Sequence, residues 1–166
     1  MSAAFDADPV FVRLFPTDRK AALTQWFDAV QAVLDGCRYG RAAAQADAVA
    51  IWTTAPCPDC LVELDERLSG LLQARAGGPG IDLVDAVQAA VQAQDGPFLH
   101  WLGVLPDARR EGSGRALLDE LGVPAWTTTA NPDAVPFYVA CGWTVVAERA
   151  VAGHPALTCW TLRTGW

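Results

Sequence analysis

The chain has 166 residues, of which 52% are hydrophobic and 19% charged, so it can build a core and is not a disordered chain. Its 12 basic and 19 acidic residues give a net charge of −7, which excludes a general nucleic-acid-binding surface because duplex phosphates need clustered positive charge. No apolar run approaches the ~20 residues that span a bilayer, and the start MSAAFDADPV lacks the regions of a signal peptide. We therefore expect a cytoplasmic protein with no nucleic-acid or membrane partner and with reduced cysteines.

The first part of the chain predicts helices around one β-hairpin. Asp18 is placed to cap a helix whose apolar residues recur at helical spacing until Gly36. Residues 38–44 and 49–54 read as two short strands. Further helices are expected over residues 61–72 and 82–94. The stretch AGGPG separates these two helices, and Gly96-Pro97 stops the second.

The second part alternates strands with short helices. Strands are expected over residues 98–104, 123–129, 144–151 and 157–163, with helices over 112–121 and 132–141 between the first three. No repeat, low-complexity segment or linker interrupts this order. The pattern predicts a single mixed α/β domain over residues 1–166, with one sheet of about six strands flanked by helices.

One glycine-containing turn has the composition of an anion site. After the strand ending at Val104, the sequence Arg109-x-x-Gly112-x-Gly114 opens the short helix. Glycines let the backbone approach a ligand, and the free N–H groups at a helix start attract anions. The arginines at 109, 110 and 115 add positive charge, which suits a pyrophosphate. A simple glycine turn between packed elements is the alternative.

A second motif follows about 25 residues later, where Asn131 is followed by Tyr138, Gly142 and Trp143. Alone, this pattern is typical of core packing. Together and in this order, the two motifs resemble the Arg/Gln-x-x-Gly-x-Gly/Ala and Asn-x6-Tyr-x3-Gly-aromatic motifs of the GNAT superfamily of N-acetyltransferases. The resemblance covers roughly residues 38–163. The segments VAIWTT, GVPA and CWTLR look most like the puromycin N-acetyltransferase-related group.

The resemblance implies a GNAT-like fold, with a mixed, mostly antiparallel sheet, and acetyl-CoA as co-substrate in a wedge between two splayed strands. Leu102, Gly103 and Val104 would pair with the pantetheine arm, and a bulge there would aim an N–H at the thioester oxygen. Asn131 would also contact the cofactor. The pyrophosphate would be held by the turn that begins at Arg109, through the amides of Arg110, Glu111, Gly112, Ser113, Gly114 and Arg115.

The resemblance also implies direct attack by an amine, with Tyr138 protonating the departing thiolate. No metal is expected. Several relatives carry a glutamate base where this chain has Phe98. On an extended strand Phe98, His100 and Leu102 share a face, so His100 points where the carboxylate would. An ordinary histidine pKa of about 6.5 suits a base, and a water chain or another residue is the alternative.

Two departures from the family pattern affect the sheet and the cofactor helix. The first strand of the family is missing, and an unprotected sheet edge favours association, such as a homodimer. Only seven residues separate Gly114 from Gly122, where relatives have about two more helical turns. The anion-binding end of the helix is retained.

The two parts of the chain differ in net charge and in the role that the resemblance implies for them. Residues 1–96, net −6, would form the acceptor side, and residues 97–166, net −1, the acetyl-CoA-binding part. We expect an acetyl-CoA-dependent N-acetyltransferase acting on a primary amine of a small molecule. The alternatives are a non-catalytic acyl-CoA-binding or regulatory module and a protein or peptide N-acetyltransferase. Cys57-x-x-Cys60, beside the expected acceptor pocket, is read first as two thiols without a function, and the alternatives are a redox pair or half of a zinc site.

Overall fold

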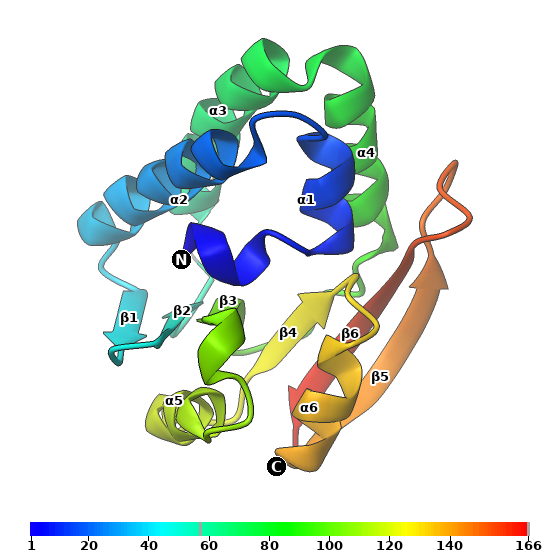
Figure 1. Ribbon diagram of the computed structural model, residues 1–166. Coiled ribbons are helices and arrows are strands. Elements are labelled where there is room, and N and C mark those ends of the chain that lie inside the picture. Colours follow the sequence, from blue (N-terminus) through cyan, green and yellow to red (C-terminus); the bar gives the residue numbers. More distant parts are fainter. Residues whose placement is uncertain (57, 166) are drawn as a thin grey trace.

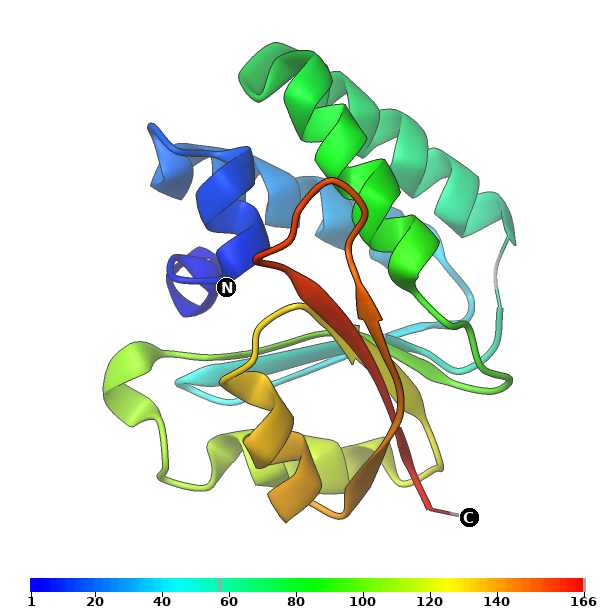
Figure 2. The ribbon, with the colours of Figure 1, turned by 90° about the vertical axis from the view of Figure 1, so that its right-hand side faces the viewer.

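A six-stranded sheet separates two helical layers (Figures 1 and 2). The computed structural model describes residues 1–56 and 58–165, with side chains for residues 1–56 and 62–165. The strands are β1 (Gly40–Ala44), β2 (Ala48–Thr53), β3 (Phe98–Val104), β4 (Trp126–Thr129), β5 (Trp143–Ala150) and β6 (Thr158–Thr164). The helical elements are η1 (Ser2–Phe5), α1 (Pro9–Leu14), α2 (Arg19–Gly36), α3 (Pro58–Arg75), α4 (Gly77–Ala90), η2 (Pro106–Ala108), α5 (Ser113–Leu121) and α6 (Ala134–Ala140).

The strand order is β1-β2-β3-β4-β6-β5, and every neighbouring pair is antiparallel except β3 with β4. Helices α1 to α4 cover one face of the sheet, and α5 and α6 cover the other (Figure 2). The predicted mixed α/β class and six-stranded, mostly antiparallel sheet are confirmed. Residues 1–39 form η1, α1 and α2 and add no strand, so β1 is an edge strand, as the missing family strand implies.

The N-terminal helices differ from the prediction in two ways. The short helix α1 was not expected, and the Asp8 carboxylate caps it by accepting from the N–H of Val10 at 2.9 Å. Asp18 is the residue before α2 but makes no capping hydrogen bond from its side chain, so its predicted role is wrong. Its backbone is left-handed, at φ 51°, and its carboxylate instead forms an ion pair with Arg75 at 3.0 Å.

The boundary between α3 and α4 lies at a single residue, Ala76. The predicted break is there, but α4 begins at Gly77 rather than at residue 82. Pro79 fits because the first turn of a helix does not use its N–H groups in the helical ladder. The helix ends at Ala90, four residues earlier than predicted at 94.

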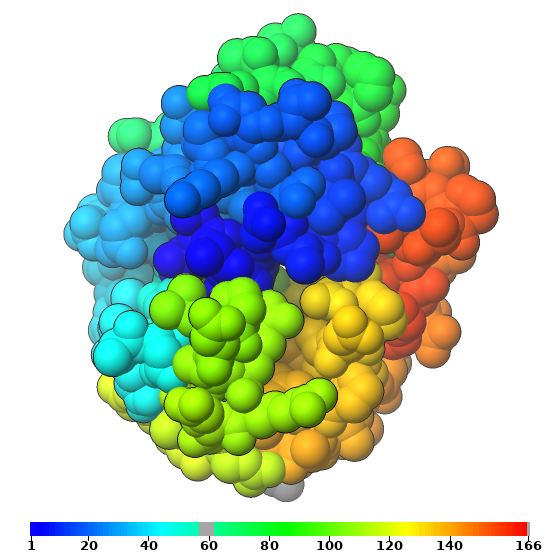
Figure 3. All heavy atoms as spheres, in the orientation of Figure 1, coloured from blue at the N-terminus to red at the C-terminus, as the bar shows by residue number. Residues whose placement is uncertain are grey.

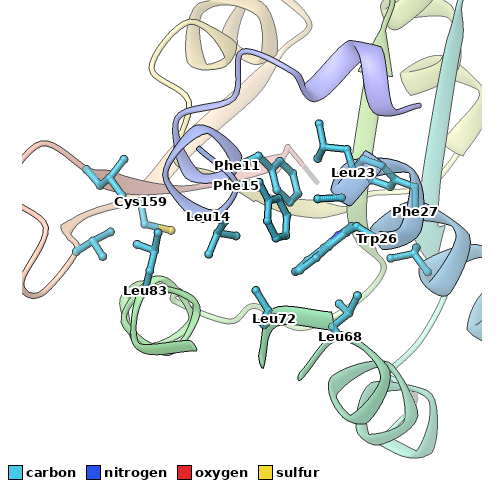
Figure 4. Close-up of a cluster of buried hydrophobic side chains, with 14 of the residues drawn as sticks. Phe11, Leu14, Phe15, Leu23, Trp26, Phe27, Leu68, Leu72, Leu83 and Cys159 are labelled. Atoms are coloured by element: carbon cyan, nitrogen blue, oxygen red, sulfur yellow. The ribbon is translucent and has the colours of Figure 1, made fainter. Parts of the chain in front are cut away.

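Each face of the sheet has its own group of buried side chains. The cluster under α1 to α4 is rich in aromatic rings, with Phe11 at 5.3 Å from Trp26 between ring centroids (Figure 4). The cluster under α5 and α6 contains Leu117, Tyr138 and Leu162. None of the described helices is long and apolar enough to cross a membrane.

The cysteines fall into two groups. Cys37 and Cys159 are buried, and Cys141 is half-buried. Cys57 and the side chain of Cys60, which make up the C-x-x-C motif, lie outside the described residues.

Leu162 tests the core on which the sheet depends. It is fully buried on β6, between Thr127 of β4 and Val145 of β5. Leu162→Ala is expected to lower the free energy of unfolding by about 2–5 kcal/mol, because it removes apolar contacts and leaves a cavity. Urea unfolding measures the change. Val139→Ala, at a residue 51% exposed on α6, is the control and should stay within about 0.5 kcal/mol of the wild type.

Candidate active site at the splayed strands

Strands β3 and β4 run together for only two residue pairs. Phe98 pairs with Trp126 and Leu99 with Thr127, and β3 has no further partner on that side. The Thr127 hydroxyl donates to the Leu99 carbonyl at 2.8 Å, which ties the two strands at the point where they part. Beyond it, Leu102, Gly103 and Val104 pair with β2 only. Their backbone groups on the β4 side are therefore available to a ligand.

A β-bulge interrupts β3 at His100. Ile51 of β2 pairs with Trp101 and the next residue, Trp52, pairs with Leu99, so His100 is the extra residue. The predicted bulge exists, but it lies two residues before Leu102 rather than at Leu102 to Val104. An extra residue shifts the alternation of side chains along the rest of the strand.

Because of the bulge, the side chains of β3 do not all point to the faces that the sequence predicted. His100 stays on the face of Phe98, with ring centroids 4.4 Å apart. Leu102 does not share that face, because it packs with the cluster under α5 and α6. Trp101 instead joins the cluster on the α1 to α4 side and lies 6.2 Å from Phe27 between ring centroids.

His100 lies among neutral groups. Its Nε2 is 3.2 Å from the Thr53 hydroxyl at the end of β2, and the rings of Phe98 and Trp101 flank it. Burial lowers the pKa of His100 from 6.5 to about 4, because the charged ring would lose its hydration. The expectation of an ordinary histidine pKa is therefore wrong for this site, and the ring is neutral at pH 7.

The Arg109–Gly114 turn enters α5 through two left-handed residues. Arg110 has φ 75° and Gly112 has φ 96°, and α5 begins at Ser113. Gly114 packs closely, since an added Cβ would come within 3.1 Å of the side chains of Phe137 and Val104, which would have to shift by a few tenths of an ångström. The turn thus brings the start of α5 against the end of β3, and the first N–H groups of the helix lie beside the open side of that strand.

The polar side chains of this turn are already engaged within the chain. The Ser113 hydroxyl donates to the Asp47 carboxylate at 2.8 Å, and Arg109 donates to the Ala4 carbonyl at 3.2 Å. Arg115 donates to the carbonyl of Ala140 at the end of α6. Figure 3 shows the dark-blue N-terminal residues lying directly above the yellow-green turn.

Asn131 and Tyr138 flank the other side of the opening. The Asn131 side chain accepts from the N–H of Asp133 at 3.0 Å, which shapes the turn from β4 into α6. Tyr138, on α6, is only 6% exposed and packs at 5.3 Å from Trp143. Burial raises the pKa of Tyr138, and the neighbouring Thr127 hydroxyl opposes that shift in part. The phenol therefore keeps its proton across the physiological range.

Several residues at the opening carry no signal in the sequence. Thr127 and Asp47 belong to no motif, and only the pairing of β1, β2, β3 and β4 brings them to this place. Ala4 and Phe5 of η1 also lie there, within about 3.0 Å of where a Cβ on Gly103 would be. Among the described residues, no group of three or more histidine, cysteine or acidic side chains is placed to hold a metal ion.

Known structures resemble this arrangement, although no family model matches the chain. A structure described as histone acetyltransferase HPA2 and related acetyltransferase from Corynebacterium glutamicum is 19% identical, with a TM-score of 0.54 over 95% of this chain and 84% of that chain. A structure assigned to the GNAT family of acetyltransferases, from Desulfovibrio desulfuricans, is 16% identical, with a TM-score of 0.49 over 96% and 93%.

Nourseothricin acetyltransferase is 20% identical, with a TM-score of 0.35 over 41% of this chain, and the match spans about half of that protein, 48%. Of the three structures, the one from Corynebacterium has a TM-score above 0.5, and we therefore compare the fold of this chain with it. The chain has the mixed α/β fold of this acetyltransferase structure.

The pKa of His100 predicts how stability changes with pH. The unfolded chain takes up this proton near pH 6.5 and the folded chain only near pH 4. Stability is therefore full above about pH 6.5 and falls as the pH drops toward 4, by about 1–3 kcal/mol. Urea unfolding at pH 7 and 4.5 should show a smaller loss in His100→Gln than in the wild type. An equal loss in both proteins would contradict a buried, neutral His100.

Proposed function

We propose that this protein transfers an acyl group from acetyl-CoA to a primary amine of a small molecule. The observation that carries the proposal is the parting of β3 from β4 after Leu99 and Thr127, beside the turn that starts α5. An extended ligand can continue the β3 ladder there, while its phosphates meet the free N–H groups of the turn. The fold shared with acetyltransferases supports the same assignment.

The residues at the opening fit acetyl-CoA, which would supply an acyl group activated as a thioester. The free backbone groups of Leu102 to Val104 would bind the pantetheine arm. Amides from Arg110 to Arg115 would hold the pyrophosphate, with Arg109 and Arg110 near it and Asn131 at the opposite edge. Arg109 would have to leave the Ala4 carbonyl to reach a phosphate.

Tyr138 is the proposed acid. Its phenol stays protonated near neutral pH because burial raises its pKa, so it holds a proton for the departing thiolate and does not act as a base, although the same shift makes it a weaker acid than an ordinary phenol. It lies on the α6 side of the sheet, next to Thr127, where the strands part. Direct attack by the amine needs no nucleophilic side chain.

The amine would approach on the opposite face, where Phe98, His100 and Trp126 lie. Phe98 and Trp126 have ring centroids 4.1 Å apart and form an aromatic wall beside His100. With a pKa of about 4, His100 is too weak a base to deprotonate an alkylammonium ion, whose pKa is near that of lysine, about 10.4. We assign it the role of accepting a hydrogen bond from the neutral amine, with water carrying the proton away.

The rival function is a non-catalytic acyl-CoA-binding module. It is favoured by the lack of a charged base on the face formed by Phe98, His100 and Trp126. Phe98 stands where several GNAT relatives carry a glutamate, and His100 is uncharged. A thiol-release assay with acetyl-CoA and a panel of small primary amines separates the two functions. Amine-dependent release supports transfer, whereas binding of acetyl-CoA with no release above the hydrolysis background supports the rival. The absence of binding would contradict both.

Tyr138→Phe tests the acid directly. The variant keeps the packing against Trp143 but loses the proton, so kcat should fall by about 10²-fold or more while KM for acetyl-CoA changes by less than about threefold. Tyr39→Phe, which removes the hydroxyl of the other tyrosine beside β1, is the matched control and should keep its activity. Unchanged turnover in Tyr138→Phe would rule out the phenol as the acid.

A further inference from the structure

A carboxylate from a distant turn lies at the start of α5. Asp47 belongs to the turn between β1 and β2, 66 residues before Ser113, and its carboxylate accepts a hydrogen bond from the Ser113 hydroxyl at 2.8 Å. Its carbonyl also accepts the N–H of Leu105 at 2.8 Å. Asp47 therefore contacts both ends of the loop from Leu105 to Ser113, and the loop holds its carboxylate in place.

This carboxylate changes the charge at the turn. Residues 105–115 carry three arginines against Asp107 and Glu111, an excess of one positive charge. Asp47 cancels that excess. Among the ion pairs of the described chain, none joins a carboxylate to Arg109, Arg110 or Arg115, so Asp47 acts on the turn through the Ser113 hydroxyl.

The turn also contacts the N-terminal segment through Arg109. The chain leaves a cavity of about 160 Å³ between Asp47, Gly103 and the N-terminal residues Met1 and Ala4. The Arg109 guanidinium reaches across to the Ala4 carbonyl. A hydroxyl and a guanidinium of this turn are thus paired with oxygens of the protein itself, where an anionic ligand would pair with them.

We propose that Asp47 is an internal competitor of the cofactor phosphates and sets the affinity of the site for acyl-CoA. The proposal rests on the function proposed above. A diphosphate on the α5 amides would meet the negative charge of Asp47 and would compete with it for Ser113. Binding must therefore move the carboxylate away or work against its charge. The turn between β1 and β2 thereby controls how readily the site fills.

Asp47→Asn tests the proposal, because asparagine keeps the shape of the turn and removes only the charge. Isothermal titration with coenzyme A at low ionic strength should show about fivefold tighter binding than in the wild type, the effect of removing one nearby like charge in a solvated site. Asp85→Asn on α4 removes an equal charge far from the turn and should leave the affinity unchanged. Thermal unfolding confirms that both variants are folded.

Salt provides a second measurement that a purely structural role would not reproduce. The Debye length falls from about 30 Å at 0.01 M to about 3 Å at 1 M salt. The advantage of Asp47→Asn should therefore shrink toward none at high salt. An advantage that persists at 1 M salt would overturn the electrostatic competition.

The outcomes also separate this inference from the proposed function. If the wild type binds coenzyme A and Asp47→Asn binds it equally or more weakly, Asp47 supports the turn and the inference alone is wrong. If no variant binds coenzyme A at millimolar concentration, the proposed function is wrong and the inference falls with it.

Discussion

The structure depends on one break in a β-ladder. Strands β3 and β4 form the single parallel pair of the described sheet, and they stay together only to Leu99 and Thr127. The bulge at His100 bends β3 at the next residue, and the Thr127 hydroxyl holds the point of parting. Everything proposed to act on a ligand lies around this opening: free backbone on β3, the start of α5 below, and Tyr138 on α6.

The opening has two chemically different sides. On the α5 and α6 side, the turn from Arg109 to Gly114 presents arginines and helix N–H groups, which suit phosphates. On the α1 to α4 side, Phe98, His100 and Trp126 present neutral rings, and burial keeps His100 uncharged at pH 7. This division predicts an anionic cofactor on one side and an amine in its neutral form on the other.

The Arg109–Gly114 turn is held by segments that are far away in sequence. Asp47 reaches it from the hairpin between β1 and β2, and Ala4 reaches it from the N-terminal segment. These contacts order the turn and at the same time use groups that a ligand would need. These contacts hold the turn in a fixed conformation but lower its affinity for an anionic ligand. In our proposal, the charge of Asp47 sets how much affinity is lost.

Local patterns determined the mixed α/β class, the six strands and the turn into α5, because hydrophobic periodicity and glycine placement act over a few residues. The glycine-containing turn brought Arg109 forward as a site residue, whereas Asn131 and Tyr138 came from the resemblance to the GNAT motifs. Tertiary structure decided the bulge at His100, which depends on the register with β2 and moves Leu102 to the other face. It also decided the low pKa of His100 and the contact of Asp47, because burial and pairing between distant segments leave no mark in a local pattern.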